Sequence, residues 1–437
     1  MRRRVAAPLL LLLPLVALAG APDARAVLHA RLRAILPDET WQPDNAPQAR
    51  PTLEGHVAAL QADPDHDNAF FVEEVHGPAT AERVVFLVPQ FHRSPVLPIT
   101  WSSLGEVISQ VQGNIDFLVT RLVRAHGVRC VGTEGSVMER MLGNPELEQM
   151  GAWLTDLRAL RETAVTTVAR EQPAVAPALD TLLRLLTPYL RRQALMLDGV
   201  GLALARLEVQ DATPEGLTRF GLEDAALNAR SLELLSRMRP LEEELALLTT
   251  PVEEDGEDAL GRMWLEEYPA FHTDVVTPVR AALATLDGVR KLSLREGDEV
   301  TAQALGRAAG LARRITDELL RTEEVEGYHR YYQELAARRA EGRGPQKKPR
   351  TLKRSEQKRK ARLEKELAAL NARYEKTAGV EREAAAVSRT LQRVGAGGAC
   401  VMVMGANHRE GLVRELTRQG GAQLGVVVVA PYRFPDE

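Results

Sequence analysis

The sequence predicts an α/β protein with a mostly parallel central sheet formed by the N- and C-terminal segments and a large all-helical insertion between them. Short, continuous apolar runs separated by an amphipathic helix occur near both ends of the chain, which is typical of strands buried on both faces of a parallel sheet. The long middle of the chain is patterned like helices instead. Because two strands alone would be only marginally stable, we expect the two ends to share one sheet.

The first residues are typical of a secretory signal peptide. Three arginines at 2–4 precede an apolar run at 9–18, and the small residues 19–21 offer a cleavage site. A second possible site follows residues 24–26. The run is too short to span a bilayer, and no cysteine follows it to carry a lipid. We therefore expect residues 1–21 to be removed from an exported protein, periplasmic or extracellular, that is not an integral membrane protein afterwards.

Composition excludes some classes of function. The 437 residues carry a formal net charge of −4, or −7 once the three signal arginines are removed, which does not suggest bulk binding of nucleic acid. Cys130 and Cys400 both lie inside apolar, strand-like runs, where cysteine behaves as a small core residue. An exported protein can form a disulfide, but this placement favours two buried thiols over a bridge.

The N-terminal part of the predicted core begins with a short helical pattern at 27–35. Residues 84–88 form an apolar run that predicts a buried strand. An amphipathic helix follows at 114–126, and Gly127 is a helix stop before a second strand at 128–132. This order is that of a β-α-β unit.

The C-terminal part repeats this order. Residues 400–404 predict a strand, 409–419 an amphipathic helix and 424–429 a further strand that Pro431 ends. The two parts of the expected core are residues 27–143 and 380–437.

Residues 144–379 are expected to be helical, with apolar residues at helical spacing over 147–170, 178–207, 222–248, 277–286 and 300–320, and with a charged helix at 363–378. Residues 220–224 read either as an edge strand or as a turn that opens a helix. Ten of the twenty-one residues at 342–362 are Lys or Arg. They predict either a solvated hairpin tip between two helices or a surface for anionic partners such as envelope lipid or polymer. No aromatic residue interrupts the run, so base stacking on nucleic acid has no support.

Polar side chains follow three of the predicted strands at their carboxyl ends, where ligands gather in open parallel sheets. Gln90 and His92 follow the first strand, Glu134 follows the second, and Asn407 and His408 follow the strand near the C-terminus. We expect His92, Glu134 and His408 to converge. Two imidazoles and a carboxylate can hold a divalent metal, or they can form a metal-free base and its orienting acid.

Five short segments resemble motifs of a known family. Residues 88–95 resemble a first Gly-x-x-His turn with a trailing Ser-Pro, 132–135 an acidic turn, 221–224 a Gly-Leu-Glu element, 381–383 an arginine motif, and 405–408 a second Gly-x-x-His turn. In order and spacing, the chain resembles the TraB/PrgY/GumN–TIKI superfamily, which is related to the erythromycin esterase-like and ChaN-like proteins.

The chain departs from the family pattern at three places. Pro89 replaces the first motif glycine, so the backbone of that turn must differ. Gln90 stands where related groups have Glu, which weakens a metal site that needs this carboxylate. Glu383 and Ala384 follow Arg382, where the family has Asn after the arginine.

The resemblance implies a hydrolase of peptide, ester or lactone bonds, because TIKI-like members are metal-dependent proteases and esterase-like members open lactones with a His base. It implies that Glu134 and His408 are either metal ligands or a general base with its partner carboxylate. It also implies that His92 supplies the second imidazole of the site. It places Arg382 beside a developing oxyanion. Glu223, in the Gly-Leu-Glu element, is a further candidate together with Gln90 and Asn407.

Two other functions stay open. ChaN-like relatives imply capture of haem or iron, for which Tyr328, Tyr331 and Tyr332 are candidate residues. The chain can instead be a non-catalytic helical scaffold on a degenerate enzyme core, with the charged helix at 363–378 and the basic segment 342–362 as its working parts.

Overall fold

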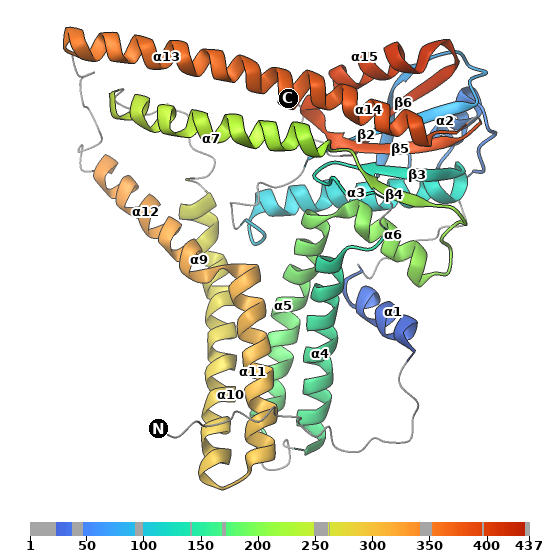
Figure 1. Cartoon of the computed structure of the whole chain (residues 1–437). Helices are drawn as coiled ribbons and strands as arrows, with labels where there is room; N and C mark the ends of the chain where they lie inside the picture. Colours follow the sequence, from blue (N-terminus) through green and yellow to red (C-terminus); the bar gives the residue numbers. More distant parts are fainter. Residues whose placement is uncertain are drawn as a thin grey trace, which may run out of the picture.

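The computed structural model describes residues 23–36, 47–91, 99–139, 142–167, 172–248, 261, 263–340, 352–395 and 397–432 (Figure 1). The predicted signal peptide and His92 lie outside these residues. The described chain contains a six-stranded sheet of order β1-β6-β2-β5-β3-β4. The predicted α/β class, with a mostly parallel sheet built from both ends of the chain, is confirmed.

The terminal segments interleave within this sheet. β6 and β5, from the C-terminal part, lie on either side of β2, and β5 separates β2 from β3. β1 is antiparallel to β6, and all other neighbours are parallel. The strands are β1 (Phe70–His76), β2 (Arg83–Gln90), β3 (Val128–Thr133), β4 (Thr218–Gly221), β5 (Ala399–Gly405) and β6 (Leu424–Pro431).

Each central strand is buried on both faces, as its continuous apolar run predicts. Val84, Phe86 and Val88 of β2 join one core, whereas Val85 and Leu87 join another on the opposite face of the sheet. α3 and α6 cover the first face, and α14 and α15 cover the second. These helices are α3 (Ser103–Ala125), α6 (Gly199–Val209), α14 (Arg382–Arg393) and α15 (Arg409–Gly420).

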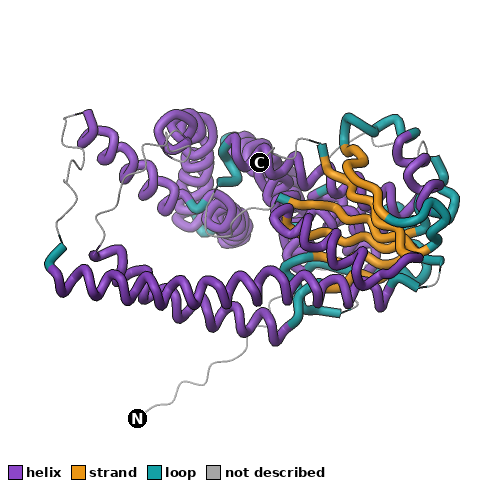
Figure 2. The backbone as a smooth tube through the Cα atoms, turned by 90° about the horizontal axis from the view of Figure 1, so that it is seen from above, coloured by secondary structure: helices purple, strands orange, loops and turns teal. Residues whose placement is uncertain are grey.

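The helical part forms two units outside the sheet (Figures 1 and 2). One is a bundle built mainly from α4 (Pro145–Thr167), α5 (Val175–Leu197), α10 (Thr277–Arg295) and α11 (Glu299–Leu320), against which α1 (Ala24–Ile35) and α12 (Thr322–Ala340) pack. The other is an arm in which α7 (Ala225–Leu248) packs along α13 (Arg354–Glu375). The remaining helical elements are α2 (Leu53–Gln61), η2 (Met263–Glu267), α9 (Tyr268–Phe271), η3 (His272–Val276), η4 (Lys376–Glu381), η5 (Ala406–His408) and η6 (Gly421–Gln423).

Several elements differ from the sequence prediction. α3 begins at Ser103 rather than near residue 114, and α2 and α12 were not predicted. The strand β1 was not predicted. Of the two alternatives for the segment at 220–224, the edge strand is the one observed, as the end of β4, so the insertion is not wholly helical. The expected helix at 178–207 is divided into α5 and α6, because the backbone of Asp198 is not helical. The Asp198 side chain accepts a hydrogen bond from the Gly201 N–H and so caps the start of α6. α13 starts at Arg354 rather than near residue 363.

The basic segment is therefore helical over its described second half. In the arm, Arg359 of α13 donates to Glu244 of α7 at 2.6 Å, so part of this positive charge is already paired. The first half of the segment, 342–351, lies outside the described residues. Among the described helices, none has the length and apolar content to cross a bilayer.

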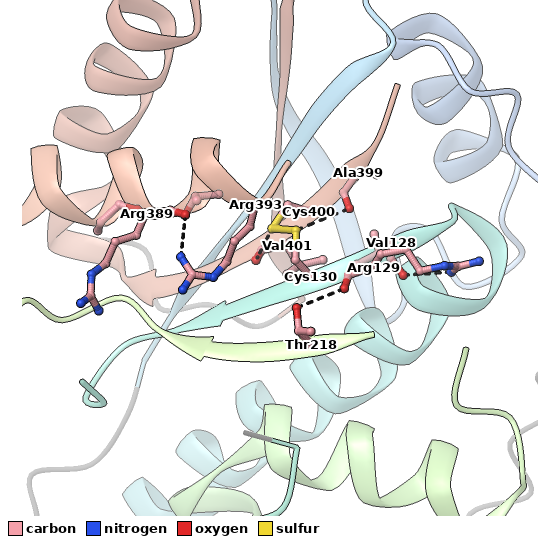
Figure 3. The surroundings of a disulfide bond; sticks show 11 residues. Val128, Arg129, Cys130, Thr218, Arg389, Arg393, Ala399, Cys400 and Val401 are labelled. Carbon is pink, nitrogen blue, oxygen red and sulfur yellow. Dashed lines mark hydrogen bonds between the residues drawn. A yellow bond between two sulfur atoms is a disulfide. The ribbon is translucent and has the colours of Figure 1, made fainter. Parts of the chain in front are cut away.

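Cys130 of β3 and Cys400 of β5 are paired residues of adjacent strands and form a disulfide (Figure 3). The preference for two buried thiols was wrong. The strand-like surroundings were predicted, but the parallel pairing that sets the two Cα atoms 4.8 Å apart depends on strand order. The bridge is consistent with an oxidising compartment.

The bridge closes a loop of 270 residues in sequence separation, so it restricts the unfolded chain strongly. We expect the Cys130→Ala/Cys400→Ala variant to lose about 2–4 kcal/mol of unfolding free energy in urea titrations. Thiol titration of the denatured, unreduced wild type should find no free thiol. Two free thiols, or a variant as stable as the wild type, would contradict this.

Two histidines are buried together at the opposite end of the strands from their carboxyl tips. His56 of α2 and His126 after α3 are 4% and 5% exposed, and their Nδ1 atoms lie 3.1 Å apart. Phe86 meets both rings edge-on. Burial lowers the pKa of His56 to about 4, and burial with the neighbouring His56 lowers the pKa of His126 to about 3.

This pair should destabilise the fold in acid. With both pKa values below 6.5 in the folded state, the unfolded chain binds more protons, so the contribution is complete above pH 6.5 and falls as the pH drops towards 4. By about pH 4.5 the loss should reach roughly 2 kcal/mol per histidine, measured by urea denaturation.

The His56→Leu/His126→Leu variant provides the comparison, since it removes both hydrogen-bonding partners together. Its unfolding free energy should fall less between neutral and acid pH than that of the wild type. Parallel pH curves for the two proteins would refute a contribution from the pair.

Candidate functional site

The polar site lies at the carboxyl edge of the parallel strands. Gln90 ends β2, Glu134 follows β3, Glu223 follows β4 by one intervening residue, and His408 follows β5. Arg382 begins α14, directly after the wide helical turn η4. The site thus draws on both terminal segments and on the chain between them.

Arg382 lies at the centre of this group. Its Nε donates to both carboxylate oxygens of Glu223 at 3.1 and 2.9 Å, and its Nη2 also contacts Glu223. The same Nη2 donates to Glu134 Oε1 at 2.7 Å, and Nη1 lies 3.2 Å from His408 Nε2. One guanidinium therefore joins side chains that follow three different strands.

Glu134 is held from several directions. Its Oε2 accepts from the Gly405 backbone N–H at 2.6 Å and from Gln90 Nε2 at 3.0 Å. A side chain at Gly405 would bring its Cβ to 3.2 Å from the same oxygen, so glycine leaves the carboxylate room beside the strand end. The carboxylate is consequently fixed in orientation before any ligand arrives.

Glu223 is positioned by the loops beside it. Its backbone N–H donates to Ser136 O at 3.0 Å, and its carbonyl accepts from Arg389 at 2.6 Å. Gly135 N–H donates to Glu223 Oε1 at 3.3 Å. The edge strand β4 thereby delivers a second carboxylate to Arg382.

His408 is oriented by Glu383. Its Nδ1 lies 3.0 Å from Glu383 Oε1, while Nε2 faces the obligatory donor Arg382. Because arginine can only donate, we assign the proton to Nδ1, which then donates to Glu383. A Cβ at Gly411 would lie 2.0 Å from Glu383 Oε2, so the missing side chain at Gly411 lets this carboxylate approach.

The site holds charged groups of both signs. The carboxylates of Glu134 and Glu223 bond to Arg382, Glu383 lies beside His408, Arg389 donates to the Glu223 carbonyl, and the exposed Arg414 reaches Glu383 at 4.0 Å. Burial lowers the pKa of Arg382, but the carboxylates of Glu223 and Glu134 outweigh it and raise that pKa. The side chains of Arg382 and His408 are 22% and 17% exposed, so water reaches both.

The structure brings together most of the predicted site residues. Glu134, His408, Arg382 and the secondary candidates Gln90 and Glu223 form one network, whereas Asn407 is exposed in the turn. His92 lies outside the described residues.

One residue of the network was missed. Glu383 was noted only as a departure from the family pattern, although it is 7% exposed and orients His408. The sequence signal that could have identified Glu383 is the charged pair Arg382–Glu383 at the start of a helix, together with Gly411 three residues after His408.

The tyrosines considered for haem lie in the helical bundle. Tyr328 stacks on Trp264, and Tyr332 contacts the exposed Tyr331. All three belong to α12. They do not join the polar network at the strand tips.

Within the described residues, no donor set fits a metal ion. The described residues contain no group of three or more His, Cys, Asp or Glu side chains able to hold one. Arg382 lies at hydrogen-bonding distance from Glu134, Glu223 and His408, so a guanidinium takes the central position that a cation would need. His92 lies outside the described residues, so the predicted metal set of His92, Glu134 and His408 stays a prediction.

Comparisons with protein-family models, with curated proteins and with solved structures each found no match. The resemblance to the TraB/PrgY/GumN–TIKI superfamily thus rests on the motifs alone.

Removing the guanidinium of Arg382 should lower the free energy of unfolding. The Arg382→Ala variant leaves Glu134 and Glu223, whose side chains are 10% and 9% exposed, without their shared partner. We expect a loss of about 3 kcal/mol in urea denaturation. Arg230→Ala, which breaks an exposed pair with Glu381, should lose less than about 1 kcal/mol. Equal losses in the two variants would show that Arg382 is no more than a surface arginine.

Proposed function

We propose that this chain is an exported hydrolase of peptide, ester or lactone bonds, of the kind that its resemblance to the TraB/PrgY/GumN–TIKI superfamily suggests. The observation that supports it is the Glu383–His408–Arg382 arrangement at the strand tips. A carboxylate that orients an imidazole is the usual arrangement of a general base. A guanidinium beside the same imidazole can stabilise negative charge that develops on a carbonyl oxygen.

In this proposal His408 is the base and Glu383 its positioning residue. A substrate carbonyl oxygen that accepts from Arg382 Nη1 competes with His408 Nε2 for the same donor. The Nε2 lone pair is then available to take a proton from water, whose oxygen attacks the carbonyl carbon. The proton on Nε2 passes to the leaving group when the bond to the carbonyl carbon breaks.

The proposal requires no metal, since the described donors are committed to Arg382. Activity should survive dialysis against EDTA. Activity lost in EDTA and restored by Zn²⁺ would contradict the metal-free mechanism.

The decisive experiment compares wild type with His408→Gln on p-nitrophenyl acetate, dihydrocoumarin and a fluorogenic casein peptide. His408→Gln should lower kcat/KM by about 10²-fold or more on the substrate that is cleaved. His76→Gln is the matched control, because His76 also pairs with a glutamate but lies on the edge strand β1. No hydrolysis of any substrate by wild type, or equal rates in wild type and His408→Gln, would reject the proposal.

Gly411→Ala separates positioning from stability. Alanine favours the interior of α15, but its Cβ would displace Glu383 from His408. We expect unchanged or higher stability with a loss in kcat that resembles that of Glu383→Gln. Full activity in Gly411→Ala would remove the argument for Glu383.

A further inference from the structure

The face of α14 that carries Arg382 presents two further arginines. Arg389 follows Arg382 by seven residues and Arg393 follows it by eleven, so the three side chains lie on one face of the helix. The side chains of Arg389 and Arg393 leave α14 towards β4 (Figure 3). Arg389 donates to the Gly221 carbonyl, and the Arg393 guanidinium lies 4.2 Å from the centre of the Phe220 ring. This face of α14 therefore contacts the end of the edge strand.

The end of β4 is held by groups other than a neighbouring strand on its outer side. β4 has four residues and lies at the edge of the sheet, where backbone groups need other partners. The N–H groups of Gly221 and Glu223 donate to the carbonyls of Met138 and Ser136 at 2.7 and 3.0 Å. The carbonyls of the same two residues accept from Arg389 Nη1 at 3.0 and 2.6 Å. One arginine thus supplies the donors that a further strand would provide.

Arg389 also lies near the loop that begins with Glu134. Its Nη2 is 3.9 Å from Oε1 of the exposed Glu139, five residues further along that loop. Arg382 joins the carboxylates of Glu134 and Glu223 directly. Arg389 joins the two chain segments that carry these carboxylates, so the two arginines restrain the same pair of groups at different levels.

We propose that Arg389 is a positioning residue of the candidate site, which holds Glu223 and, through it, the guanidinium of Arg382 beside His408. The inference rests on the proposed hydrolase, in which Arg382 binds the carbonyl oxygen of the substrate. The guanidinium of Arg389 suits this role, because it is planar and can donate to two acceptors in a fixed geometry.

The loss of Arg389 would act on the site through the backbone. The Gly221 and Glu223 carbonyls would lose this donor, and the end of β4 would be less restrained. The Glu223 carboxylate would move with its backbone and weaken its bond to Arg382 Nε. Arg382 Nη1 would then leave its position 3.2 Å from His408 Nε2. Because that guanidinium binds the oxyanion more strongly than the neutral carbonyl, kcat should fall while KM changes little.

Steady-state kinetics of Arg389→Met, on the substrate that wild type cleaves, test the inference. Methionine keeps an unbranched side chain but offers no donor. We expect kcat about tenfold lower with KM within about twofold, since small misplacements of a catalytic group reduce the rate strongly. Arg389→Lys, which keeps a cationic donor, should recover most of the loss.

Arg393→Met is the matched control. The side chains of Arg393 and Arg389 are 20% and 21% exposed, and both lie near Glu139. Arg393 contacts the Phe220 ring instead of the Glu223 carbonyl, so Arg393→Met should leave kcat unchanged. Equal kcat in wild type and Arg389→Met, or equal losses in Arg389→Met and Arg393→Met, would overturn the proposal.

A second measurement does not depend on catalysis. In protein labelled with ¹⁵N-arginine, the Nε–H signal of Arg382 is the one missing from Arg382→Lys. This N–H donates to Glu223, so it should exchange slowly with water in wild type and in Arg393→Met. Exchange should be about tenfold faster in Arg389→Met, because the bond opens more often.

The two measurements separate this inference from the proposed function. If wild type cleaves no substrate, the hydrolase is rejected, and the exchange rates alone decide whether Arg389 positions Arg382. Equal exchange of the Arg382 Nε–H in wild type and Arg389→Met would overturn the positioning role, whatever the activity of the protein.

Discussion

The insertion of β5 between β2 and β3 is the constraint on which the rest of this structure depends. β5 pairs in parallel with both neighbours, so the C-terminal segment completes a sheet that the N-terminal segment cannot form alone. In this register Gln90 lies opposite Gly405, and Thr133 lies opposite Val403. The three strand ends therefore align, and the side chains that follow them can meet. The disulfide between Cys130 and Cys400 joins β3 to β5 nearer their amino ends.

Arg382 resolves the electrostatic conflict that this alignment creates. Strand ends that converge bring Glu134 and Glu223 towards one another, and two carboxylates at such low exposure would repel without a shared cation. The guanidinium bonds to both and also faces His408, so one side chain supplies charge balance and a position for chemistry. A fixed guanidinium needs no metal to play this part.

The two edges of the sheet carry different polar groups. The carboxyl edge holds the carboxylates of Glu134, Glu223 and Glu383 beside Arg382 and His408, while the described lining of the cavity at the amino edge includes His56, His126, Arg124 and Arg129. The helical bundle and the arm of α7 and α13 pack outside the sheet, so they do not interrupt the order of its strands (Figure 1). The arm continues through η4 into Arg382, so its long helix also places the central residue of the candidate site.

The sequence by itself determined the buried strands β2, β3, β5 and β6, because continuous apolar runs have only one favourable location in an α/β protein. It also determined the helical periodicity and the polar residues that follow each strand. Only the tertiary structure decided the strand order, the edge strands β1 and β4, and the bridge between Cys130 and Cys400. It alone paired Glu383 with His408 and His56 with His126. Each of these depends on contacts between distant or differently oriented segments, and local propensity carries no record of such contacts.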